Sequence, residues 1–109
     1  HRRELKQFLV DLGYGIVQER CLVEGNQYYD IWLVERGATS VYKSLPNTSM
    51  LWEYGALLQK EQSPVWIGYI ERRIDALQSI LKHMREASKS SDAIEAMQNE
   101  IQELQGLIV

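Results

Sequence analysis

The sequence predicts an α+β fragment: a helix and an antiparallel β-hairpin, followed by an antiparallel coiled-coil helical hairpin. Three observations support this prediction. Apolar residues recur at helical spacing before Gly13, two strand-like runs flank a Gly-Asn turn, and two heptad-like seams occupy residues 64–109. With 109 residues, 45% hydrophobic and 25% charged, the chain has an ordinary globular composition and is long enough for about one small domain.

The first element is an amphipathic helix over residues 2–12. Its apolar residues lie at helical spacing: Leu5, Phe8, Leu9 and Leu12. Gly13 follows at the position where a left-handed residue commonly ends a helix. Because the sequence begins with His1 one residue before this helix, we expect the C-terminal part of a longer protein; a trimmed short leader would look the same.

The hairpin has two unlike strands, over residues 14–23 and 28–35, joined by a turn at 24–27. Strict alternation puts Ile16 on one face of the first strand and Glu19 on the other. The second strand is apolar at nearly every position, and only Asp30 interrupts it. Strands covered on both faces show such continuous runs. We therefore expect cover above and below the second strand, while the first strand tolerates an edge.

Residues 38–63 read as a linker followed by a short helix that Gly55 weakens. Ser63-Pro64 is a typical helix start. Two seams then follow at spacings of three and four, with a capping-box pattern at Asp92 and Glu95 between them. We divide the chain into 1–37, 38–63 and 64–109. The seam residues are Ile70, Ile74, Leu77, Leu81 and Met84, then Ile94, Met97, Ile101, Leu104 and Ile108.

The net charge of −3 argues against a chain that coats nucleic acid through bulk electrostatics. The charge is unevenly distributed, however, because residues 64–89 are net positive and 90–109 carry only acidic charges. The two helices could pair through opposite charge, or the basic side chains could bind phosphates. The candidate RNA-binding residues are Arg72, Arg73, Lys82, Arg85 and Lys89, and a second patch near the start could comprise Arg2, Arg3 and Lys6.

The sequence contains no complete catalytic, cofactor-binding or metal-binding constellation. No G-x-G-x-x-G motif occurs, and His1 and His83 lack metal-ligand spacing. The single cysteine, Cys21, lies among apolar strand residues and is read as a packed thiol. One cysteine and no membrane-length apolar run favour a reducing, cytoplasmic setting without a membrane partner.

Two stretches resemble a known family. "FLVDLGYGIVQERCLVEGNQYYDIWLVERG" looks like the end of the catalytic domain of bacterial, TrmK-like tRNA (adenine-N1)-methyltransferases, and "LWEYGALLQKEQSPVWIGYIERRIDALQSIL" is similar to the segment that follows it there. The matching positions in the first stretch are Gly13, Tyr14, Glu19, Gly25 and Tyr29. In the second stretch they are Glu53, Gly55, Leu58 and Pro64.

The resemblance implies that residues 1–37 end a Rossmann-like, class I methyltransferase sheet in a longer enzyme that uses S-adenosylmethionine. Its coiled-coil region would assist tRNA binding. The family's cofactor loop and catalytic residues would lie before His1, so none is assigned here, and this chain alone should not methylate. The expected partners are tRNA and the remainder of the catalytic domain, with a monomeric state. The alternative is a non-enzymatic coiled-coil interaction module.

Overall fold

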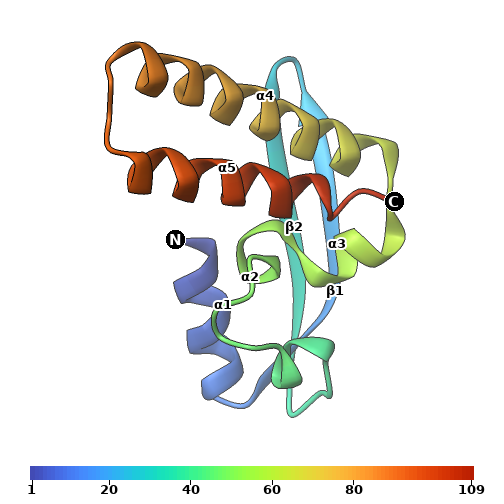
Figure 1. Cartoon of the computed structure of the whole chain (residues 1–109). Coiled ribbons are helices and arrows are strands. Elements are labelled where there is room, and N and C mark those ends of the chain that lie inside the picture. The colour runs from blue at the N-terminus through green and yellow to red at the C-terminus, as the bar shows by residue number, and fades with distance from the viewer. The chain divides into compact units, whose positions relative to one another are not determined.

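The computed structural model describes all residues from 1 to 109, which form two compact units, 1–66 and 67–109. The first unit contains a two-stranded antiparallel sheet with several helices, which confirms the predicted α+β class (Figure 1). Residues 38–63 belong to the first unit. No helix is both long enough and apolar enough to span a bilayer.

Helix α1 (Arg2–Asp11) forms where the spacing predicts it, and Gly13 follows with φ +93. Its orientation is unexpected. An amphipathic helix usually buries its apolar side, yet in α1 the fully buried side chain is Lys6. Much of the apolar side remains open to solvent, with exposed fractions of 50–58% at Leu5, Phe8 and Leu12.

Strands β1 (Tyr14–Glu24) and β2 (Gln27–Arg36) form the predicted hairpin, with Gly25 at φ +60 in its turn. The pairing contains a β-bulge that strict alternation does not predict. Ile16 pairs with Val34 and Gln18 with Leu33, so Val17 is the extra residue. The bulge shifts the side-chain alternation by one position. Ile16 and Glu19 therefore share the covered face, and the predicted placement of Glu19 opposite Ile16 is wrong.

The two faces of β2 differ in cover. Asp30, Trp32 and Val34 are half-buried on the inner face. The other face, which we call the outer sheet face, is about half exposed at Leu22, Tyr29, Ile31 and Leu33. Within this chain β2 is therefore covered on one face only, whereas the sequence predicts cover on both.

The segment after the hairpin packs against the inner face. It forms the 3₁₀ helix η1 (Val41–Ser44), α2 (Leu51–Tyr54) and α3 (Ala56–Glu61). The predicted single short helix is split, because Gly55 adopts φ +100 and leaves room for Leu58, which a Cβ at position 55 would approach to 2.7 Å. The inner-face core contains Ile16, Tyr42, Trp52 and Ala56.

Helices α4 (Pro64–Glu86) and α5 (Ser91–Gln105) supply the C-terminal part. The Ser63 hydroxyl accepts a hydrogen bond from the Trp66 amide at 3.3 Å, so Ser63 caps α4 as the Ser63-Pro64 sequence predicts. The cap of α5 is Ser90, which accepts the Ala93 amide, and not the predicted Asp92. Every predicted seam residue is buried or half-buried. Coiled-coil packing itself stays a prediction, and Ile108 lies beyond the end of α5.

Candidate functional site

A buried charge pair lies on the inner sheet face. The side chains of Lys6, from α1, and Glu19, from β1, are both fully buried. The Lys6 Nζ donates to Glu19 Oε2 at 2.7 Å. The same ammonium lies 4.8 Å from the centre of the Trp32 ring and 5.1 Å from that of Tyr42, so it has two aromatic neighbours as well as its counter-ion.

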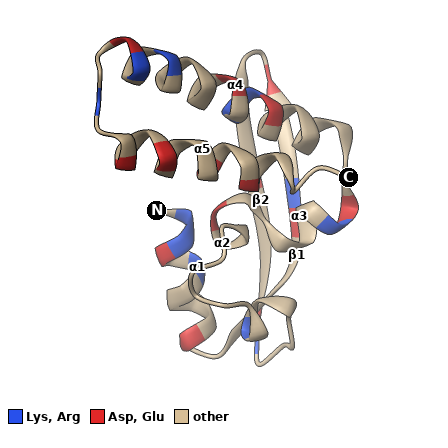
Figure 2. Ribbon diagram, viewed as in Figure 1, with Lys and Arg blue, Asp and Glu red and all other residues tan.

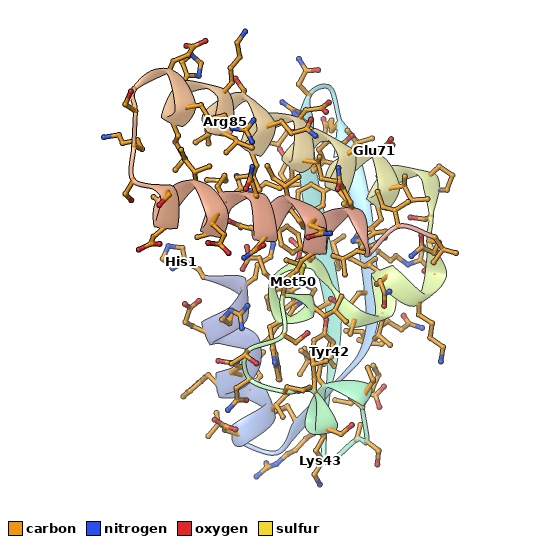
Figure 3. All side chains as sticks on the ribbon, viewed as in Figure 1. His1, Tyr42, Lys43, Met50, Glu71 and Arg85 are labelled. Atoms are coloured by element: carbon orange, nitrogen blue, oxygen red, sulfur yellow. The ribbon has the colours of Figure 1, made fainter.

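Tyr42 completes this cluster, which we call the Glu19 network (Lys6, Glu19 and Tyr42). Tyr42 is buried at the centre of the first unit, whereas the adjacent Lys43 is exposed (Figure 3). Its hydroxyl donates to Glu19 Oε1 at 2.6 Å and lies 3.1 Å from Lys6 Nζ. Burial, and then the charge of Glu19, raise the pKa of Tyr42 far above its ordinary value, so the phenol stays neutral.

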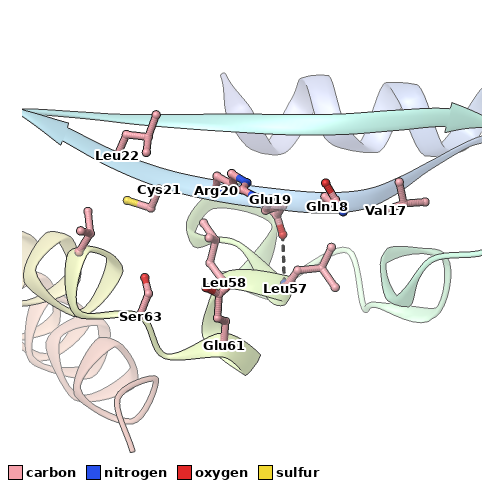
Figure 4. A pocket seen from close by; sticks show the side chains of 11 residues that line it. Val17, Gln18, Glu19, Arg20, Cys21, Leu22, Leu57, Leu58, Glu61 and Ser63 are labelled. Atoms are coloured by element: carbon pink, nitrogen blue, oxygen red, sulfur yellow. Dashed lines mark hydrogen bonds between the residues drawn. The ribbon is translucent and has the colours of Figure 1, made fainter.

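The network also holds the beginning of α3. The Ala56 amide donates to the Tyr42 hydroxyl at 2.8 Å, and the Leu57 amide donates to Glu19 Oε1 at 3.0 Å (Figure 4). Gly55, the N-cap residue, has no side chain to bind these amides. Residues from η1 and β1 therefore cap α3 in place of a local side chain.

A second ion pair connects α1 to the hairpin. Arg2 Nε lies 2.9 Å from Asp30 Oδ1, and the Trp32 indole donates to Asp30 Oδ2 at 2.7 Å. The predicted basic patch of Arg2, Arg3 and Lys6 is therefore wrong for Lys6, which is buried. The signal in the sequence is that Arg2 and Lys6 lie one helical turn apart, a spacing that puts both on one side of α1.

The chemistry of this cluster is structural. No buried side-chain nitrogen or oxygen lacks a hydrogen-bond partner. The carboxylate of Glu19 accepts hydrogen bonds from Lys6, Tyr42 and the Leu57 amide, so its charge is engaged within the protein. We therefore read the Glu19 network as a connection between α1, β1, η1 and α3.

A groove of about 430 Å³ runs beside β1, between that strand and α3 (Figure 4). Cys21 lies in it, half-buried, and burial raises the pKa of its thiol. A raised pKa lowers the thiolate fraction, which supports the prediction of a packed rather than a nucleophilic cysteine. The remaining lining residues include Gln18, Arg20, Leu57, Leu58, Glu61 and Ser63.

The five candidate RNA-binding side chains of residues 64–109 are all exposed. At about 100° per residue they do not form one stripe on α4. Arg72 lies on the side of α4 opposite the buried residues Ile74 and Leu81. Arg85 lies beside that buried side, about 20 Å along the helix axis from Arg72. The structure thus separates a proximal pair, Arg72 and Arg73, from what we call the distal basic group: Lys82, Arg85 and Lys89.

No acidic side chain pairs with the distal basic group. Lys82, Arg85 and Lys89 form no ion pair, although α5 carries only acidic charges (Figure 2). Charge pairing of the two helices, the alternative to phosphate binding, thus has no support at these three positions. Their ammonium and guanidinium groups are available to an anionic partner.

Comparison with known proteins identifies related sequences and folds. The family model described as tRNA (adenine(22)-N(1))-methyltransferase, TrmK, matches residues 1–106. No curated protein sequence matches the chain. A structure of a Streptococcus pneumoniae protein assigned as a tRNA (m1A22) methyltransferase superposes with a TM-score of 0.82 at 25% identity, over 100% of this chain and 46% of that one.

Two further structures agree in fold. The same Streptococcus pneumoniae protein, in complex with S-adenosyl-L-methionine, matches with a TM-score of 0.74 at 23% identity, over 100% of this chain and 44% of that one. The B. subtilis m1A22 tRNA methyltransferase TrmK matches with a TM-score of 0.78 at 18% identity, over 100% of this chain and 48% of that one. This chain therefore spans less than half the length of the solved structures it matches.

Proposed function

Because the chain belongs to the TrmK family, the tRNA (adenine(22)-N(1))-methyltransferases, we propose that it forms the C-terminal part of an enzyme that methylates N1 of an adenine in tRNA. The family match over residues 1–106 carries this proposal. The partial coverage of the solved structures supports a larger enzyme, because this chain corresponds to less than half of each of them.

The hairpin completes the catalytic sheet in this proposal. The outer sheet face, and the apolar side of α1 at Leu5, Phe8 and Leu12, are exposed here to an extent unusual for residues that favour burial. A hairpin with an uncovered apolar face also gains stability from further strands and helices. The remainder of the catalytic domain is the partner that would cover these surfaces.

The helices α4 and α5 hold tRNA in this proposal. The distal basic group is exposed and outside any ion pair, which suits contacts to backbone phosphates. Such contacts position a nucleic acid without reading its sequence, so the choice of nucleotide falls to the catalytic domain.

S-adenosylmethionine is the methyl donor in this proposal, as a neighbour's complex with it suggests. The chain has no Gly-rich loop to cradle that cofactor, and the carboxylates of buried Glu19 and half-buried Asp30 are engaged within the first unit. The cofactor and the reacting adenine would therefore bind to the remainder of the catalytic domain. The residues described here position and support that site.

The direct test is methyl transfer by the whole protein to a tRNA transcript with adenine at position 22. We expect N1-methyladenine at that position, and no product when guanine replaces the adenine. The 109-residue chain alone should neither bind S-adenosylmethionine nor transfer methyl groups. A whole protein that leaves the transcript unmodified would contradict the proposal.

The alternative, a coiled-coil interaction module, predicts a different hydrodynamic behaviour. If α4 and α5 dock a second copy of the chain, the whole protein should form a concentration-dependent dimer in sedimentation. The enzyme proposal expects a monomer that binds tRNA. Substituting seam residues would then lower stability without changing the oligomeric state.

A further inference from the structure

The outer sheet face carries a single positive charge. The bulge at Val17 places Arg20 on this face, whereas the preceding residue, Glu19, points toward α3 (Figure 4). Arg20 is the only Lys or Arg among the side chains of the outer sheet face. The full set is Gln18, Arg20, Leu22 and Glu24 of β1, with Gln27, Tyr29, Ile31, Leu33 and Glu35 of β2.

The neighbours of Arg20 on this face are apolar. In the register of the hairpin, Arg20 lies opposite Ile31, and its diagonal neighbours on β2 are Tyr29 and Leu33. These three side chains are 47–54% exposed. Arg20 therefore lies near the middle of β1, beside the most apolar part of the outer sheet face.

No acidic side chain of this chain pairs with Arg20. Its side chain is exposed and belongs to none of the ion pairs of the structure. The two carboxylates on the same face, Glu24 and Glu35, occupy strand positions about 13 Å away, because each lies four residues along the sheet at roughly 3.3 Å per residue. The charge of Arg20 is thus open to a partner from another segment.

Cover over β2 also reaches Arg20. Neighbouring strands lie about 4.8 Å apart, whereas a helix with its side chains is about 10–12 Å wide. A helix packed on Tyr29, Ile31 and Leu33 would therefore lie against Arg20 as well. Removing a charge from water is costly unless the charge is paired and hydrogen-bonded. The planar guanidinium group fits a carboxylate, which accepts two parallel hydrogen bonds from it.

We propose that the outer sheet face receives an amphipathic helix from the remainder of the catalytic domain, and that this helix pairs an Asp or Glu side chain with Arg20. The inference rests on the proposed function, which supplies that remainder. More than half the length of the matching solved structures lies outside the part that this chain spans, which leaves ample chain for such a helix. Apolar contacts alone permit a helix to slide, and a single charged pair selects one register.

The first test is thermal melting of the whole protein with Arg20→Met. This substitution places an apolar side chain on an apolar face, yet we expect it to lower the melting temperature by about 5 °C, because the partner carboxylate stays covered and unpaired. Gln18→Met is the matched control on the same face, and it should leave the melting temperature unchanged or raise it. If Arg20→Met behaves as Gln18→Met does, the guanidinium group stays in solvent and the inference is overturned.

The second test identifies the partner and remains informative if Arg20→Met does not fold. Arg20→Lys keeps the positive charge and introduces an amine, which a carbodiimide joins directly to a carboxylate in contact with it. In the whole protein we expect a cross-link from position 20 to an Asp or Glu outside residues 1–109. It should form about tenfold more often than a cross-link from Gln18→Lys, because the yield follows proximity.

The site of the cross-link decides the outcome. A cross-link to Glu24 or Glu35 would place the partner within the hairpin, and one to an acidic residue of 67–109 would assign the cover to the C-terminal helices; either result overturns the inference, as do equal yields from the two amines. If the unsubstituted whole protein does not methylate tRNA, the proposed function fails instead, and the cross-link still shows which segment covers Arg20.

Discussion

The Lys6 ammonium and the Glu19 carboxylate lie 2.7 Å apart, and both side chains are fully buried. Thirteen positions separate them in the sequence, and they come from different elements, α1 and β1. Because the charges neutralise each other away from water, neither can be removed alone without leaving the other buried and unpaired.

This coupling predicts strongly non-additive substitutions. Glu19→Leu alone should lower the free energy of unfolding by about 3–5 kcal/mol, since it leaves the Lys6 ammonium buried. Adding Lys6→Met should restore at least about 2 kcal/mol, because the second substitution removes the unpaired charge. Urea denaturation of the whole protein measures both values. Additive effects would contradict the pairing, and Glu4→Gln, at an exposed carboxylate of α1 outside this pair, should leave the midpoint unchanged.

Tyr42 predicts a loss of stability at high pH. Its pKa is raised far above the usual value by burial and by Glu19, so the folded protein keeps the phenolic proton that the unfolded chain releases above pH about 10. The stabilisation is complete below pH 10 and falls by about 1.4 kcal/mol per pH unit above it. Denaturation between pH 9 and 11.5 should show this fall in the unsubstituted protein. In Tyr42→Phe the free energy of unfolding should depend less steeply on pH, because unfolding then releases one proton fewer. Parallel pH profiles would contradict the burial of the phenol.

Gly15 predicts a steric effect. A Cβ at this position would lie 2.3 Å from the Ala38 carbonyl oxygen, so the backbone has to shift. Gly15→Ala should lower the free energy of unfolding by about 2–3 kcal/mol. Gly25→Ala is the matched comparison, because a Cβ there meets nothing within 4 Å and only the φ of +60 opposes it. That change should cost about 1 kcal/mol. A thermal melt in which Gly25→Ala lowers the melting temperature more than Gly15→Ala would contradict the close approach of Gly15 to Ala38.

The sequence predicts the order and type of the elements well, because spacing and turn residues are local signals. Helix α1, both strands, the Ser63-Pro64 start and the division between α4 and α5 follow from them. Local signals do not reveal the bulge at Val17, which one extra residue creates and which decides that Glu19 faces inward. Alternation alone places Glu19 on the wrong face.

The polar core is missed for a related reason. A lysine in a helix is normally exposed, and only its tertiary partners make burial tolerable. Those partners, Glu19 and Tyr42, are contributed by segments that pattern reasoning assigns to a strand and a linker. The family resemblance locates no site residue either, because it implies that the family's cofactor loop and catalytic residues lie outside this sequence.

The distal basic group predicts a salt-dependent contribution to tRNA affinity. In the whole protein, replacing Lys82, Arg85 and Lys89 by alanine should weaken binding and reduce the slope of log K against log salt by about 2–3. Lys43→Ala with Lys60→Ala is the control, since both are exposed lysines of the first unit. Filter binding between 50 and 200 mM salt gives both quantities. An unchanged slope would exclude phosphate contacts at this end of α4.

Substitutions on the outer sheet face should have opposite effects in the chain alone and in the whole protein. Ile31 is 54% exposed and Leu33 47% exposed in this chain, so replacing both with threonine removes exposed apolar surface and leaves a β-branched side chain, suited to a strand, at each position. In the 109-residue chain we expect less binding of a hydrophobic dye, less self-association in sedimentation and an unchanged melting temperature.

In the whole protein the same double substitution should be destabilising. If the remainder of the catalytic domain covers this face, each replacement loses buried apolar area, at a cost of about 1–2 kcal/mol per residue. Gln18→Thr, an exposed polar position on the same face, is the control and should be neutral in both forms. Equal stability of the substituted and unsubstituted whole protein would mean that the outer sheet face stays open, and the hairpin would then not be the interior end of a larger sheet.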